Sequence, residues 1–130
     1  MDIKEKANQY HDKGFNCAQG VLSSCAEYTG LDEKISLAIA GALGGGCRCG
    51  EICGALSGAL LAVGMCCPFN DAENLEAKEK IAELARYVTG SFREEFGNVR
   101  CEDLKGKKHT CPELISYAAA LAEKTIKEKI

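Results

Sequence analysis

Cysteines are the residues of this sequence whose types and spacing could do chemistry, and the chain of 130 residues contains nine of them. Four stand where helices are expected to begin: Cys17, Cys53, Cys101 and Cys111. At a helix start, unpaired backbone N–H groups and the helix dipole favour a thiolate over a thiol. Thiolates bind soft metal ions and iron–sulfur clusters, and they also exchange with disulfides. The pattern therefore predicts that these four side chains converge on one metal or redox site.

Three further cysteines are expected to be structural. Cys66 and Cys67 lie at the far end of the helix predicted to start near Cys53. A continuous helix would place them roughly 20 Å away along its axis, too far to share a small site within one subunit. Cys25 lies two turns beyond Cys17 on its own predicted helix and is expected in the core.

The glycine-rich stretch Gly41–Gly64 is the segment around which the rest of the chain is organised. Its loop, Gly44–Gly46, is followed by Cys47 and Cys49, which either enlarge the site or have no role; the sequence leaves both open. Beyond the loop, small residues recur every four positions along one face of a predicted helix: Gly50, Gly54, Gly58 and Ala62. We expect another helix or a subunit to approach this face closely.

Apolar residues at helical spacing predict helices throughout the chain, and no strand-like alternation occurs. Asn16, Asp32 and Asn70 are suitable N-caps for three of these helices, and the central helix is expected from about Gly50 to Cys67. Residues 1–130 are therefore predicted to form a single all-α domain. Its expected architecture is a compact bundle of about six helices around the central glycine-rich helix.

Composition excludes several classes of partner. A formal net charge of −3 and a pI near 5.4 argue against nucleic acid. The uncharged segment between Glu51 and Asp71 reaches the lower limit for a membrane span, but its many small residues and Pro68 favour a buried helix. Met1–Tyr10 is charged and polar, so we expect no signal peptide and a reducing, cytoplasmic location.

No hydrolase or nucleotide-binding motif occurs, which leaves open whether the chain is an enzyme.

These residues resemble a known family. The motif around Cys17, the glycine run before Cys53-Gly54-Ala55-Leu56-Ser57-Gly58, and then Cys101 and Cys111 are similar to the C-GCAxxG-C-C family of redox-active proteins. The likeness extends from Gly14 to about Ile115, and the family's four defining cysteines carry over onto Cys17, Cys53, Cys101 and Cys111. The module also resembles the amino-terminal part of split-Soret cytochromes, which are dimeric and carry an iron–sulfur centre. The chain departs from the usual family loop by adding Cys47 and Cys49.

The leading interpretation is a small iron–sulfur protein, of [2Fe–2S] type, for electron transfer or redox sensing, with Cys17, Cys53, Cys101 and Cys111 as ligands. It would work with a redox protein partner, and the resemblance allows a homodimer. Two alternatives stay open at this point. The first is a metal-free dithiol/disulfide oxidoreductase that uses the same thiols in pairs. The second is a four-cysteine zinc site in an interaction module.

Overall fold

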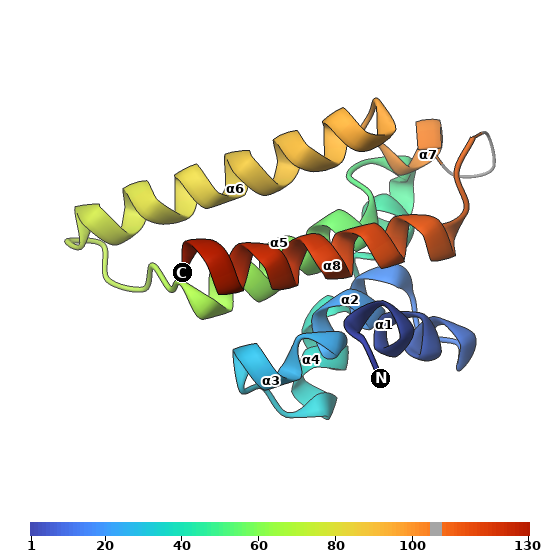
Figure 1. The fold of residues 1–130 in the computed structure, drawn as a ribbon, viewed down its shortest axis with the longest axis horizontal. Coiled ribbons are helices and arrows are strands. Elements are labelled where there is room, and N and C mark those ends of the chain that lie inside the picture. The colour runs from blue at the N-terminus through green and yellow to red at the C-terminus, as the bar shows by residue number, and fades with distance from the viewer. Residues whose placement is uncertain (105–107) are drawn as a thin grey trace.

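The computed structural model describes residues 1–104 and 108–130, and the fold is all-α, as the sequence predicts (Figure 1). Six described helices have eight residues or more: α1 (Ile3–Asp12), α2 (Cys17–Ser24), α4 (Glu33–Ala40), α5 (Gly54–Cys66), α6 (Leu75–Phe96) and α8 (Cys111–Lys129). Three shorter segments join them: α3 (Ala26–Thr29), the π-helical turn η1 (Gly46–Gly50) and α7 (Cys101–Leu104).

Helix α5 is the centre of this arrangement, because it packs against α2, α3, α6 and α8. Figure 1 shows α6 and α8 running side by side along the long axis, with α1–α4 on the opposite side of α8 from α6. No helix of residues 1–104 and 108–130 is both long enough and apolar enough to cross a bilayer.

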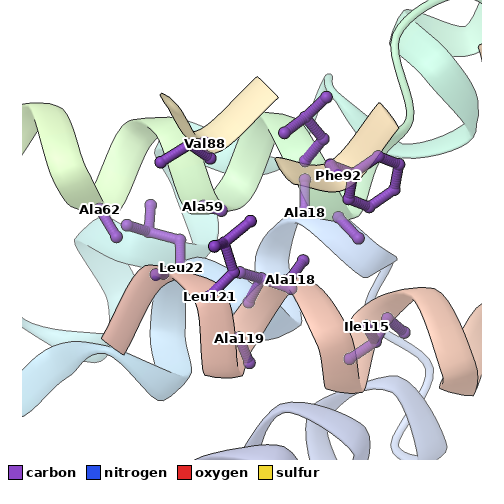
Figure 2. Close-up of a cluster of buried hydrophobic side chains, with 14 of the residues drawn as sticks. Ala18, Leu22, Ala59, Ala62, Val88, Phe92, Ile115, Ala118, Ala119 and Leu121 are labelled. Carbon is purple, nitrogen blue, oxygen red and sulfur yellow. The ribbon is translucent and has the colours of Figure 1, made fainter. Parts of the chain in front are cut away.

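Small side chains let these helices approach closely. Ala59 and Ala62 of α5 are fully buried in the cluster that also holds Phe92 of α6 (Figure 2). A Cβ atom added at Gly58 would lie 2.7 Å from the carbonyl oxygen of Ala18 and 3.0 Å from Cβ of Val21, both on α2. The prediction that the small-residue face of the central helix lies against another helix is therefore confirmed, and α2 is that helix.

Helix boundaries follow local capping chemistry. Asn16 and Asp32 cap α2 and α4 as expected, since their side chains accept hydrogen bonds from Gln19 N–H and Lys34 N–H. Thr110 caps α8 in the same way and forms a capping box with Glu113. Each capped start sets the position of the residue that follows, which for α2 and α8 is a cysteine.

Two predicted helix starts were wrong. Helix α6 is capped by Asn74, not Asn70, because the Asp71 carboxylate accepts from Glu73 N–H in a turn that competes with the helix. Leu75 is consequently 66% exposed, outside the core. The central helix begins at Gly54, not near Gly50, because Gly50 has a left-handed backbone (φ +76°).

Candidate four-cysteine site

Four cysteines line one small cavity of about 20 Å³, together with Gly45 and Leu114. They come from four different helix starts, as the sequence indicates: Cys17 opens α2, Cys53 caps α5, Cys101 opens α7 and Cys111 opens α8. These residues are as much as 94 positions apart in sequence (17 to 111). The fold therefore brings together all four cysteines that the sequence singled out.

Backbone hydrogen bonds hold Cys53 and Cys101 next to each other. The N–H of Cys53 donates to the carbonyl of Val99 at 2.7 Å, and the N–H of Cys101 donates to the carbonyl of Glu51 at 2.6 Å. These two bonds run in opposite directions between the chain entering α5 and the chain entering α7. The two hydrogen bonds fix the starts of α5 and α7 relative to each other. They therefore also fix the positions of Cys53 and Cys101 relative to each other.

Arg100 makes three ion pairs beside this pairing, one across it to Glu51 and two within its own segment. Its guanidinium lies 3.3 Å from Glu51, 3.1 Å from Glu102 and 3.2 Å from Asp103. The side chain of Arg100 is 41% exposed, so each pair is screened by solvent and its main effect is on geometry. Sequence reasoning missed Arg100, because its main partner Glu51 lies 49 positions away and no local signal marks the contact.

Glycines make room for the sulfurs. A Cβ atom at Gly54 would collide with the sulfur of Cys17 and would lie 3.0 Å from the carbonyl oxygen of Leu43. At Gly46, where φ is +64°, a Cβ atom would lie 2.8 Å from Cβ of Cys101. The glycine run therefore brings bare backbone against two of the four cysteines, which is the role that the dense glycines suggested.

Burial, and not the helix start, controls the protonation of two thiols. Burial raises the pKa of Cys53 to about 11, although the nearby N–H groups of Leu56 and Ala55 act to lower it. Burial also raises the pKa of Cys17, against the effect of the Gly45 N–H group. The expectation that helix starts favour thiolates is therefore wrong for these two cysteines in the absence of a bound cation, because desolvation outweighs the local N–H groups.

Mutual repulsion also raises both pKa values, because the sulfurs are close. Negative charge on Cys111 and Cys101 raises the pKa of Cys17, and charge on Cys17 and Cys101 raises that of Cys53. A set of four thiolates this close together would be stable only with a compensating positive charge among them.

The other five cysteines lie outside the cavity. Cys47 and Cys49 are exposed on the turn η1 and do not line it. Cys25 is fully buried, as predicted, and its pKa is influenced by Cys66, so these two lie near each other. Cys66 and Cys67 end α5, which is continuous from Gly54 to Cys66. The distance argument that separated these residues from Cys53 therefore agrees with the fold.

The four cysteines are suitable ligands for a metal group, but the cavity between them is small. Four cysteine thiolates are the usual ligands of iron–sulfur clusters and of structural zinc. A cavity of about 20 Å³ has room for roughly one water molecule. In the described residues, no group of three or more His, Cys, Asp or Glu side chains stands close enough to hold a metal ion as placed. The residues fit such a group chemically, but the side chains would have to rotate to bind it.

The fold and the site define a small helical protein with four cysteines at converging helix starts. The family model described as "Putative redox-active protein (C_GCAxxG_C_C)" matches residues 15–125, and the chain belongs to this family. Family membership supports a redox role. No curated protein and no solved structure matches the chain.

Proposed function

We propose that this chain is a redox protein that binds an iron–sulfur cluster, of [2Fe–2S] type, through Cys17, Cys53, Cys101 and Cys111. The observation that carries the proposal is the single cavity lined by all four of these cysteines. Membership of a redox-active family supports the same class of chemistry. A bound cluster would supply reversible one-electron transfer.

The protein's own residues would hold and shield such a group. Cys53 is buried at this cavity, which Leu114 also lines, while Cys17, Cys101 and Cys111 are half-buried. The backbone N–H groups beside Cys17 and Cys53 would stabilise the negative charge of four ligated sulfurs. The half-buried side would give a redox protein partner access for electron transfer.

The small size of the cavity favours a second candidate function. A metal-free dithiol/disulfide oxidoreductase needs only two sulfurs within bonding reach at a time and no internal space. The raised pKa values of Cys17 and Cys53 do not favour this alternative, because the thiolate is the form that attacks a disulfide. A single zinc ion would also need less space than a cluster. The choice therefore depends on whether iron and sulfide are present.

Purification without oxygen tests the proposal directly. We expect coloured protein that contains iron and acid-labile sulfide in equal amounts and little zinc. Colourless, iron-free protein that still reduces a disulfide substrate would overturn the cluster proposal in favour of the dithiol alternative. Zinc at one equivalent without sulfide would instead establish the four-cysteine zinc site. The homodimer and the cytoplasmic location stay predictions from the sequence.

A further inference from the structure

Asn16 directly precedes Cys17, and the two ends of its side-chain amide make different contacts. Its Oδ1 atom accepts a hydrogen bond from Gln19 N–H at 2.9 Å, and Oε1 of Gln19 accepts one from Asn16 N–H at 2.9 Å. This capping box starts α2 and therefore sets the position of Cys17. Capping uses only the oxygen of the Asn16 side chain. The nitrogen is available for a second contact.

The side-chain nitrogen of Asn16 contacts the C-terminal end of α4. Its Nδ2 group donates to the carbonyl of Gly41 at 3.0 Å, and Nε2 of Gln19 donates to the carbonyl of Leu37 at 3.0 Å. Carbonyl groups at the C-terminal end of a helix lack helical N–H partners, so side chains can satisfy them. The two residues that start α2 therefore also hold the end of α4, which lies about twenty positions further along the chain.

The glycine loop Gly44–Gly46 packs directly on Asn16. A Cβ atom added at Gly44 would lie 2.5 Å from both Cβ and Cγ of Asn16, so only bare backbone fits there. Asn16 thus contacts the chain at Gly41, by a hydrogen bond, and at Gly44, by packing. Because Gly45 follows directly, these two contacts limit where Gly45 can lie.

Gly45 is the residue of this loop that lines the four-cysteine cavity. Burial raises the pKa of the Cys17 thiol, and the N–H group of Gly45 is the strongest influence that acts to lower it. Beyond Gly45, the N–H of Cys47 donates to the carbonyl of Leu43 at 3.2 Å and closes the loop. The position of Gly45 therefore affects how much negative charge the Cys17 sulfur can carry.

We infer that Asn16 is a positioning residue of the four-cysteine site, which holds the glycine loop so that the N–H group of Gly45 lies beside the sulfur of Cys17. This role is separate from capping, because the cap uses Oδ1, whereas the loop is held through Nδ2 and side-chain packing. Hydrogen bonds to cysteine sulfurs are one of the features that set the reduction potential of iron–sulfur proteins. Asn16 therefore acts on the site through Gly45, without touching a ligand sulfur itself.

Two substitutions remove the Nδ2 donor and keep the cap. Aspartate and serine are both good N-caps; Asn16→Asp keeps the size of the side chain, and Asn16→Ser adds no charge. In the reduced, metal-free protein, we expect the amide hydrogens of Gly45 and Cys47 to exchange with solvent about tenfold faster or more in both variants. Exchange at Ala118 and Ala119, in the buried part of α8, should not change.

Asn74→Ser is the matched control, because Asn74 caps α6 by accepting from Ala77 N–H at 3.0 Å, and its Nδ2 makes no hydrogen bond to the described residues. Unchanged exchange at Gly45 and Cys47 in both Asn16 variants, or equal acceleration in Asn74→Ser, would overturn the inference. Should neither Asn16 variant fold, the unaltered protein still provides a test. The side-chain amide hydrogens of Asn16 should exchange more slowly than those of Asn74, and equal rates would overturn the inference.

The reduction potential provides a second measurement, which rests on the proposed function. In iron-loaded protein, Asn16→Ser should have a lower potential than Asn74→Ser and the unaltered protein, because an N–H group that stabilises the added electron is displaced. Protein without iron would overturn the cluster proposal, and amide exchange would then decide the role of Asn16 alone. Faster loop exchange with an unchanged potential would show that Gly45 does not act on the ligand sulfur, and would overturn the inference.

Discussion

The sulfur of Cys17 occupies the space that the Cβ atom of any other residue at position 54 would need, so Gly54 and Cys17 define each other's positions. This contact joins the start of α2 to the first turn of α5, the two helices that pack most extensively in the fold. The carbonyl oxygen of Leu43 also lies close, at 3.0 Å from the position of a Cβ atom at residue 54. The site and the core are therefore built from the same pair of helices.

Gly54→Ala is expected to displace the Cys17 sulfur. The added methyl group also meets the backbone of Leu43 and Gly44, which cannot rotate away, so the free energy of unfolding should fall by about 1–3 kcal/mol. Gly64→Ala is the matched control on the same helix, since a Cβ atom there would meet nothing within 4 Å. It should raise stability by about 0.5–1 kcal/mol. Thermal or urea unfolding measures both, and equal stability in the two variants would contradict the contact.

Gly58→Leu should overpack the interface between α5 and α2. Its side chain would be directed at Ala18 and Val21, and we expect a cost on the order of 1–3 kcal/mol or more. Gly90→Leu, on the exposed side of α6, has open space for the first side-chain atom and should unfold nearly as the unaltered protein does. An unchanged melting curve for Gly58→Leu would refute the predicted close packing of this face.

The sequence was sufficient for the helix starts that a single residue caps, because Asn16 and Asp32 act through neighbours three or two positions away. It also indicated which four of the nine cysteines would lie together, since Cys17, Cys53, Cys101 and Cys111 share one local setting, the start of a helix. It failed where two local signals compete. Asp71 forms its own turn and shifts the start of α6 by several residues.

Features that depend on distant contacts were beyond local reasoning. The residues with positive φ between Gly46 and Gly50 cannot continue into a right-handed helix, so α5 begins only at Gly54. Gly46 in this segment packs against Cys101, far away in sequence. The same applies to protonation. A helix start lowers the pKa of a thiol by a local effect, but the burial that raises the pKa of Cys53 to about 11 comes from the whole fold.

Alkaline pH should destabilise the protein partly through Cys25. Burial raises the pKa of this thiol from an ordinary value of 9.0 to about 12 in the folded chain. The contribution is therefore fully present below pH 9 and is lost as the pH rises toward 12, because only the unfolded chain then releases the proton. The slope should approach about 1.4 kcal/mol per pH unit.

Cys25→Ala isolates this contribution from those of other cysteines and tyrosines. The difference in unfolding free energy between the unaltered protein and the variant should shrink as the pH rises from 9 to 12. Urea unfolding at a series of pH values measures it. A constant difference over this range would show that Cys25 does not titrate on unfolding as proposed.

Substitution of the three distant cysteines should leave any cofactor intact. Cys25→Ala, Cys66→Ser and Cys67→Ser combined remove thiols that lie outside the cavity. We expect iron and sulfide per chain to be unchanged, although the buried change at Cys25 will lower stability. Loss of bound metal in this variant would indicate a site shared with these residues, for example across two subunits.

Single Cys→Ser changes at the cavity distinguish the two leading functions. If Cys17, Cys53, Cys101 and Cys111 hold one cluster, each change should bleach or severely destabilise it, with similar severity at all four positions, because the cavity is bounded by all four sulfurs. If the thiols work as two disulfide pairs, Cys17 with Cys53 and Cys101 with Cys111, the effects should divide two and two, and iron content should not follow activity. Visible absorption, iron analysis and disulfide reduction, measured on all four variants prepared without oxygen, provide the comparison. The exposed Cys47→Ser variant is the matched control for colour and iron content, since Cys47 lies close in sequence to the site but outside its cavity.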